Sequence, residues 1–458
     1  MNLSFVNLFF VNKNMFPDTN QVSHEEHHKQ VSWVYFAIMV LGLWLITSPI
    51  IFGYSWTQMF WNDIISGIIL IILSYNALNA YNLWAQWLII LLGLWLFVAP
   101  IVFWANEAAA FLNDNLIATL VVAFGIIIPN QPGIKLFEQE GKNTPPGWSY
   151  NPSSWIERTP IITMAWFGYF AAQYLAAFQL GFIDKAWDPF FEDGTKNVLT
   201  SEVSKAFPVS DAALGAFAYI LDVLMGYAGG TNRWRTMPWA VIIFGILILP
   251  LGVISITLVI LQPLAVGYWC SLCLFTALIS TIMIPFTIDE MLATIQLMRH
   301  ESKRGKALWT IFWFGGSMEG GYNEKTPEPA LLLKKTGKVI MMDFFTKPWN
   351  LFISAAVGLA IMTAPAYIEY TKKIANNNYV IGALIITFSV IATSEVARPV
   401  RFLNMFLGLW MIASPWILGS AQTEAILASV TTGAVLIPLS IPKGKVKDRR
   451  GDYDNHIF

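Results

Sequence analysis

The sequence contains two cysteines, Cys270 and Cys273, in the motif GYWCSLC at the start of an apolar segment. A Cys-x-x-Cys pair that opens a helix can close a disulfide, and the partial positive charge of the helix N-terminus favours the thiolate of its first sulfur. Cys270 is therefore the candidate reactive thiol. Such a pair also arises by chance, because buried cysteines are common apolar fillers.

Metal chemistry is a weaker interpretation. No His and no second cysteine pair lies near enough in sequence to give Cys270 and Cys273 a tetrahedral zinc site. His24, His27 and His28, in SHEEHHKQ, could share a helical face. No oxygen or sulfur ligands converge on them from neighbouring sequence, so a solvated stretch before the membrane is favoured and we predict no metal centre.

The composition is that of a polytopic membrane protein. Of 458 residues, 56% are hydrophobic and 12% are charged, with 20 tryptophans and a mean hydropathy of +0.55. The net charge of -1 says nothing about partners, because the basic residues are concentrated in a few short loops. MNLSFVNLFFVNKN has no basic residue before its apolar part and no small-residue cleavage site, so we expect a tail rather than a secretory signal.

Twelve apolar segments of about membrane-spanning length follow Trp33, and backbone groups in lipid require them to be helices. They cover residues 32–53, 63–80, 84–104, 113–129, 161–182, 209–228, 237–261, 267–287, 349–368, 379–396, 401–419 and 424–442.

An internal repeat organises the outer thirds of the chain. Its four copies are GLWLITSP (Gly42 to Pro49), GLWLFVAP (Gly93 to Pro100), GLAIMTAP (Gly358 to Pro365) and GLWMIASP (Gly408 to Pro415). Small residues permit close helix contact, and the proline bends or ends the helix near the interface. The pattern resembles the SPW repeat family, although only Ser414-Pro415-Trp416 has the full tripeptide. We see no ionisable pair along these helices, so packing is favoured over a substrate pathway.

The predicted organisation is an all-α membrane protein with a central four-helix bundle between two pairs of helix-hairpin repeats. Its parts are a cytoplasmic tail (1–30), a repeat pair (31–130), a linker (131–160), the bundle (161–290), a cytoplasmic amphipathic loop (291–347), a second repeat pair (348–442) and a basic cytoplasmic tail (443–458). NTPPGWSYNPSSW marks the linker by its turn residues. KALWTIFWFGG and ALLLKKTGKVIMMDFF are interfacial pieces of the loop, whose basic residues suit lipid headgroups rather than nucleic acid.

Charge asymmetry predicts the orientation. With twelve spans and the N-terminus inside, the outer loops hold five of the 28 Lys and Arg residues, namely Lys185, Lys196, Lys205, Lys372 and Lys373. Both termini are then cytoplasmic, and the cysteines lie at the outer, oxidising face of the cell membrane, where a disulfide can form. The acidic loop before the sixth helix, residues 183–208, lies on the same face.

The middle section resembles the vitamin K epoxide reductase family, in SKAFPVSDAALGAFAY, PLGVISITLVILQP and GYWCSLCLFTALIS. The resemblance implies a four-helix bundle whose Cys-x-x-Cys passes electrons from thiols to a quinone of the ubiquinone or menaquinone type. It makes Cys270 and Cys273 the redox pair, and Ser201 or Ser204 the polar group that caps the quinone pocket. The family's second, shuttle cysteine pair is missing from residues 183–208, so an external thiol protein of thioredoxin-like kind must reach the pair directly.

Three further residues enter the hypothesis. Tyr268 and Trp269 are candidates to stack on the quinone, although aromatics at a helix opening are also ordinary interface anchors. Asp222 lies inside the sixth helix and is a candidate for proton handling, but pairing with Arg233 or Arg235 is the simpler interpretation.

Three functions remain open. The first is a membrane thiol-disulfide oxidoreductase coupled to a quinone. The second is a non-catalytic membrane scaffold that keeps a structural cysteine pair. A transporter comes last, because the repeats show neither a broken helix nor a buried charge pair.

Overall fold

The computed structural model describes residue 28 and residues 32–53, 58–79, 82–105, 107–127, 141–206, 208–324, 348–419 and 422–454. Over these ranges the chain is helical and contains no β-strand. Eleven helices are long and apolar enough to cross a membrane, or up to twelve if one bent pair counts as a single span. The predicted all-α multi-pass fold is confirmed.

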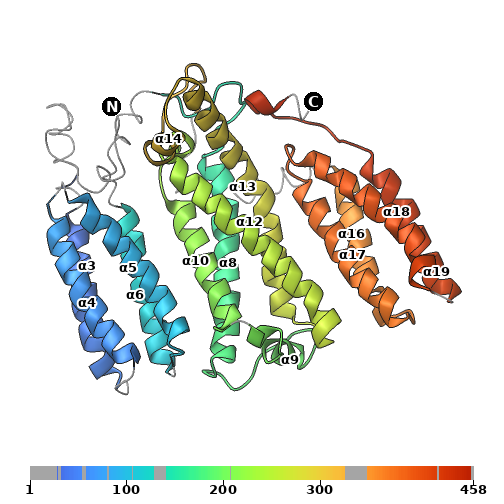
Figure 1. The fold of residues 1–458 in the computed structure, drawn as a ribbon, viewed down its shortest axis with the longest axis horizontal. Coiled ribbons are helices and arrows are strands. Elements are labelled where there is room, and N and C mark those ends of the chain that lie inside the picture. Colours follow the sequence, from blue (N-terminus) through green and yellow to red (C-terminus); the bar gives the residue numbers. More distant parts are fainter. Residues whose placement is uncertain are drawn as a thin grey trace.

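Three groups of helices lie side by side in Figure 1. The N-terminal module consists of α3 (Trp33–Ile51), α4 (Gln58–Ala77), α5 (Leu83–Val102) and α6 (Ala108–Ile127). The central bundle consists of α8 (Trp155–Gln179), α10 (Asp211–Tyr227), α12 (Pro238–Leu261) and α13 (Ser271–Lys303). The C-terminal module consists of α16 (Trp349–Thr363), α17 (Lys372–Ile391), α18 (Arg401–Leu418) and α19 (Thr423–Ser440).

The bent pair precedes the second helix of the bundle. α9 (Gly194–Leu199) and the turn that follows it run to Ala206, and α10 then leaves at 88°. α10 has 17 residues, so it reaches the length of a membrane span only when residues 194–206 are counted with it. The structure therefore places a short half-helix over one end of the bundle, at the bottom of Figure 1.

Close glycine contacts hold the repeat hairpins together, as the sequence predicts. A Cβ atom on Gly42 would lie 2.8 Å from the carbonyl oxygen of Gly67, and one on Gly358 would lie 2.8 Å from that of Gly382. Such contacts leave no room for a side chain, so α3 packs backbone to backbone on α4, and α16 on α17. α3, α5 and α18 each end within a turn of the repeat proline.

α13 differs most from the sequence prediction. The sequence places a loop from Asp289 onward, but the helix continues to Lys303 because the segment keeps one buried face, including Ala293 and Leu297. The amphipathic loop predicted for 291–347 thus begins as helix. α14 (Leu308–Phe314) carries exposed Leu308 and Trp309, whereas ALLLKKTGKVIMMDFF lies outside the described residues.

A polar layer, which we call the cap, covers the end of the bundle opposite α9. It combines residues 141–155 and 315–324, the last turns of α13 and residues 447–454. Trp148 donates its indole N–H to Gln296 at 2.8 Å, and the Tyr150 hydroxyl donates to Asp289 at 2.5 Å. The described parts of the predicted linker and C-terminal tail are therefore docked segments rather than free chain.

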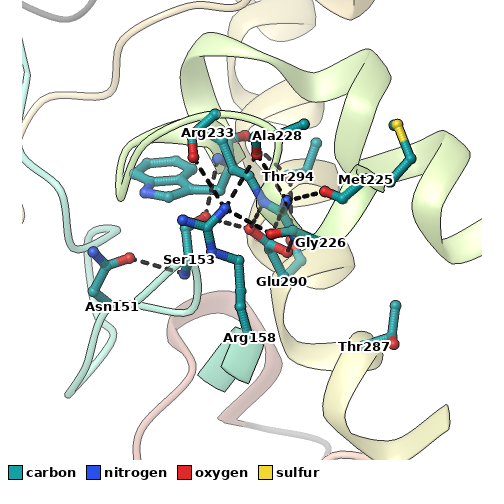
Figure 2. A network of polar contacts seen from close by, with 12 residues as sticks. Asn151, Ser153, Arg158, Met225, Gly226, Ala228, Arg233, Thr287, Glu290 and Thr294 are labelled. Carbon is teal, nitrogen blue, oxygen red and sulfur yellow. Dashed lines mark hydrogen bonds and ion pairs between the residues drawn. The ribbon is translucent and has the colours of Figure 1, made fainter. Parts of the chain in front are cut away.

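A buried ion pair lies beneath the cap (Figure 2). Arg233 contacts Glu290 through two nitrogen–oxygen pairs, at 2.6 and 2.5 Å, and Ser153 also donates to Glu290. Arg158 donates to the carbonyl oxygens of residues 226, 228 and 229. The predicted pairing of Asp222 with Arg233 or Arg235 is wrong. Arg233 is bound to Glu290, and Arg235 donates to the carbonyl oxygens of Gly141 and Lys142. The Asp222 carboxyl is fully buried and accepts no hydrogen bond from the described residues.

Candidate functional site: a disulfide beneath a half-helix

Cys270 and Cys273 form a disulfide at the first turn of α13, with their Cα atoms 5.3 Å apart. Cys270 is the N-cap of that helix, in an extended conformation, and its sulfur accepts the backbone N–H of Cys273 at 3.1 Å. The motif therefore folds as the sequence predicts. The sulfur that caps the helix is also the one that the helix N-terminus would stabilise as a thiolate.

The two sulfurs differ in accessibility. Cys270 is fully buried, in a cluster with Leu175 of α8 and Leu199 of α9, whereas Cys273 is only half-buried. α9 is the element that makes this difference, because it lies across the start of α13. The candidate reactive thiol Cys270 is thus the less accessible of the pair.

Asp188 fixes this arrangement from the loop after α8. One carboxyl oxygen accepts the backbone N–H groups of Ser271 and Thr195, both at 3.1 Å, and the Thr195 hydroxyl at 2.7 Å. The other accepts the Ser271 hydroxyl and the backbone N–H groups of Phe190 and Phe191. A single carboxylate therefore ties the loop, the start of α9 and the start of α13 together.

The same bonds decide the charge of Asp188. Partial burial would raise the pKa of this carboxyl, but the hydrogen bonds from Ser271, Thr195 and the loop amides hold it well below its ordinary value. Asp188 is thus a fixed negative charge near the disulfide at neutral pH. In sequence it is one of several acidic residues of the outer loop, and only its distant partners distinguish it.

Thr195 and Gln262 bring further polar groups to Cys270. The Thr195 hydroxyl oxygen lies 3.5 Å from the Cys270 sulfur, and the Gln262 side-chain oxygen accepts the Cys270 backbone N–H at 3.0 Å. Thr195 has one hydroxyl hydrogen and two acceptors, the Cys270 sulfur and the closer Asp188 oxygen. If Cys270 became a thiolate, this hydrogen could be donated to the sulfur instead.

Gly194 lets the half-helix approach the motif. A Cβ atom at this position would lie 2.0 Å from the carbonyl oxygen of Trp269, a distance that side chains do not tolerate. Residues 188, 194, 195 and 262 thus complete the site. Sequence reasoning missed Asp188, Gly194 and Thr195 because they lie far from the cysteines in the chain, and it missed Gln262 because no motif marks a lone glutamine eight residues before Cys270.

The two serines that the resemblance suggests lie just beyond α9, and their hydroxyl hydrogens are used within the protein. Ser201 donates to the carbonyl oxygen of Val198 at 2.7 Å. Ser204 donates to Asp211 at 2.8 Å and accepts from Gln179 at 2.8 Å. A bond from either hydroxyl to a quinone oxygen would require it to give up its present acceptor.

The two aromatics before the cysteines face different surroundings. Tyr268 is exposed, whereas the Trp269 ring makes an edge contact with Tyr379 of α17, with ring centroids 5.6 Å apart. Trp269 therefore joins the bundle to the C-terminal module. This is a packing contact between modules, and both membrane-interface anchoring and quinone stacking stay predictions for Tyr268 and Trp269.

An open apolar groove of about 540 Å³ lies beside the same half-helix. Its walls are Glu202, Val203 and Ala206 on one side and residues of the last turns of α12, from Ile254 to Leu261, on the other. The groove adjoins Ser201 and Ser204 in sequence, and its volume is that of a typical small-molecule site.

The fold and this site define a multi-pass membrane protein that carries a disulfide at one membrane face. Residues 159–288 match the family model for the vitamin K epoxide reductase family, and residues 32–128 and 348–442 match that for the SPW repeat domain. The chain therefore joins a vitamin K epoxide reductase family segment to two SPW repeat segments, as the sequence resemblance indicates. Searches of curated proteins and of solved structures returned no match.

Proposed function

We propose that the protein is a membrane thiol-disulfide oxidoreductase that passes electrons from an external thiol protein through Cys270 and Cys273 to a quinone. The observation that carries the proposal is the disulfide at the N-terminus of α13, inside the segment that matches the vitamin K epoxide reductase family. Members of this family use quinone-type substrates. The type of quinone is not specified by any residue of the groove.

In the first step a partner thiolate attacks the Cys273 sulfur, the more accessible of the two. The bond between Cys270 and Cys273 breaks, and Cys270 leaves as a thiolate. The helix N-terminus, the backbone N–H of Cys273 and the Thr195 hydroxyl favour that thiolate. A second partner thiol then attacks the mixed disulfide, so the partner loses two electrons and two protons and leaves as a disulfide.

In the second step the reduced pair returns to the disulfide. A bound quinone supplies the oxidant, because it takes up two electrons and two protons and becomes a quinol. The apolar groove between α12 and residues 202–206 would hold the ring, and Ser201 or Ser204 would exchange its present acceptor for the quinone oxygen.

We place the cysteines at the external face and both termini in the cytoplasm. Support comes from the charges, because the cap end carries Arg158, Arg233 and Arg450, whereas the α9 end carries the acidic loop. An impermeant maleimide added to intact cells after mild reduction should label Cys273. A Ser149→Cys reporter in the cap, in a background without native cysteines, should react only after lysis. The opposite pattern would reverse the orientation.

The redox proposal is tested in isolated membranes by the thiol-alkylation mass shift of the pair. After mild reduction, added quinone should restore the disulfide, and the matching quinol should not. A Cys270→Ala variant should trap a mixed disulfide at Cys273 with a dithiol partner, whereas Cys273→Ala should trap far less because Cys270 is buried. A pair that stays reduced with quinone present would contradict the proposal.

A non-catalytic scaffold is the second candidate, and a specific observation favours it. The sequence has no other cysteine to act as a shuttle, and Asp188 and Gln262 fasten the site in its oxidised form. A scaffold predicts a disulfide that resists mild reduction and whose removal lowers thermal stability without changing any quinone-dependent signal.

A further inference from the structure

Two acidic residues lie inside helices of the N-terminal module, Asp63 on α4 and Asp114 on α6. Both side chains are fully buried. Asp63 follows Pro49, and Asp114 follows Pro100, at the same interval, so the two residues are equivalent positions of the repeat. The expectation that the repeats lack a buried ionisable pair is therefore wrong, because it rested on the octapeptides alone.

The two carboxyl groups lie close enough to interact, because Phe60 and Phe111, one turn before Asp63 and Asp114, pack in one cluster and the two acids influence each other electrostatically. Asp63 accepts one bond, from the Asn62 amide at 3.1 Å, while its other oxygen and both oxygens of Asp114 accept no well-formed hydrogen bond from the described residues. The nearest donor to Asp114 is the Asn113 amide, which donates to Ser48 at 3.1 Å. Two carboxylates are both acceptors and cannot bond to each other. A hydrogen bond between them requires that one carries a proton.

The described helices around the pair supply no positive charge to offset two carboxylates. The residues one turn before the pair on α4 and α6 are apolar, namely Met59, Phe60 and Phe111. The buried residues that follow the pair along the same two helices are apolar as well, namely Leu70 and Ala118. α3, α4, α5 and α6 contain no Lys, Arg or His. Two negative charges in such a place would repel each other at low dielectric without a counter-ion.

The C-terminal module provides an internal comparison. The second helix of three hairpins has a glycine that packs on the octapeptide glycine, and a buried polar residue stands one helical turn before it: Asp63 before Gly67, Asn378 before Gly382 and Ser429 before Gly433. Asp114 stands one turn before Ala118 in the same way. All four side chains are fully buried. The repeat thus has a buried polar position in every copy, and only the N-terminal module fills both of its copies with acids.

We propose that Asp63 and Asp114 form a proton-binding site in the membrane, in which the two carboxyl groups hold one exchangeable proton between them. A metal cation fits less well. No third His, Cys, Asp or Glu joins the pair among the described residues. The amide oxygens of Asn62 and Asn113 are already bonded to the indole N–H groups of Trp95 and Trp44, at 2.9 and 2.8 Å.

An open groove lies on the side of Asn62, the residue that donates a hydrogen bond to Asp63. An open groove of about 600 Å³ between α4 and α5 is lined by Asn62, Ser66 and Trp95, among other residues. The Asn62 amide donates a hydrogen bond to Asp63, so one side chain separates the groove from the carboxyl pair. A reagent in this groove would have to displace the Asn62 side chain to reach the fully buried carboxyl groups.

The titratable groups on the packed elements are few. α5 contributes none, and Glu107 directly precedes α6. The others are Tyr35 on α3, Tyr75 on α4, Glu157, Arg158, Tyr169 and Tyr174 on α8, and Asp211, Tyr219, Asp222 and Tyr227 on α10. Arg158 is bonded to carbonyl oxygens beneath the cap, at the other end of the bundle from the start of α10, so it does not neutralise the pair.

The test is labelling of the full-length purified protein with a hydrophobic carbodiimide, which reacts with protonated carboxyl groups. Mass spectrometry should find one adduct per chain, on either Asp63 or Asp114, and Na⁺ or Li⁺ at constant ionic strength should not reduce it. Protection by Na⁺ would show a metal-cation site and overturn the proposal. Absence of an adduct, or adducts on both residues of one chain, would also overturn it.

Two variants sharpen the result. Asn378→Asp places a lone carboxyl at the equivalent position of the C-terminal module, and its labelling should disappear at a lower pH than that of the pair. The double change Asp63→Asn with Asp114→Ser gives the N-terminal module the C-terminal pattern, and it should remove the adduct while the protein stays folded. Equal pH profiles for the pair and the lone carboxyl would contradict a shared proton.

Discussion

Asp188 is the residue on which the site depends most, because six donors from three segments converge on its carboxylate. Replacing it by Asn leaves one acceptor oxygen for them, and a lost hydrogen bond to a charged group costs about 1.5–3 kcal/mol. We expect Asp188→Asn to lower the melting temperature of the purified protein and to speed reduction of the disulfide. Asp184→Asn, an exposed carboxyl of the same loop, is the matched control and should behave as wild type.

The same residue predicts a pH dependence. The folded protein holds the pKa of Asp188 below its ordinary value of about 3.9, so the ionised form stabilises the fold. This contribution is complete above that value and is lost as the pH falls toward the folded pKa. Thermal melts between neutral and acidic pH should therefore separate the two proteins: the gap between wild type and Asp188→Asn should narrow in acid. A constant gap would show that the charge of Asp188 is not what matters.

Residue-level contacts were also the least predictable from the sequence. The Cys-x-x-Cys pair was found because its chemistry is local, within one helical turn. Asp188 acts through partners elsewhere in the chain, so nothing in its own neighbourhood marks it. Gln262 lies eight residues before Cys270, but its contact depends on the turn between α12 and α13, which the sequence pattern does not define. Asp63 and Asp114 did carry a signal, their equal spacing from the repeat prolines, but it lay outside the repeated octapeptides.

At the scale of elements, the position of α9 decides how far the disulfide is covered. Gly194→Ala would drive a methyl group into the Trp269 carbonyl, so the half-helix must move away from α13. We expect faster alkylation of Cys270 after reduction and a lower melting temperature. Gly215→Ala on α10 is the control, because its Cβ would meet only the Cβ of Ala172, at an ordinary 3.9 Å. Unchanged alkylation in Gly194→Ala would show that α9 does not shield the thiol.

The sequence predicted that each transmembrane helix exists, but it did not predict where several of them begin and end. Hydropathy located the twelve helices, because a span must be apolar over most of its length. It placed the starts of α4, α6 and α17 too late. For α17 the omitted residues KKIANNN are polar, so hydropathy does not register them as part of a span. It ended α13 too early for a related reason: beyond Asp289 the helix packs on the cap rather than on lipid.

For the whole molecule, Arg450 is the joint between the bundle and the C-terminal module. Its guanidinium pairs with Asp289 of α13 at 3.0 Å and with Glu395, after α17, at 2.6 Å. Burial would raise the pKa of Glu395, but the bonds from residues 447, 448 and 450 keep it below its ordinary value. The joint therefore keeps its charges at neutral pH and weakens in acid.

Removing this arginine should separate the two parts. Arg450→Met leaves Asp289 and Glu395 without their cation, and breaking a buried pair in this way costs about 3–5 kcal/mol. Hydrogen exchange should rise in the cap and at the end of α17, with little change around the disulfide. Arg449→Met, at the exposed neighbouring position, is the control. Protection that is equal in both variants would mean that other contacts hold the modules together.

The cap also has a consequence for biogenesis. The cap is built from residues 141–155, 289–303, 315–324 and 447–454. The first and the last of these segments are separated by most of the chain. Trp148 forms a backbone bridge with Arg450, which is synthesised much later than Trp148. The N-terminal module and the bundle can insert and pack while translation continues, because their transmembrane helices pack on one another without the last residues. Closure of the cap therefore requires residues 447–454, and a nascent chain stalled before residue 447 would present an intact disulfide site under an open cap.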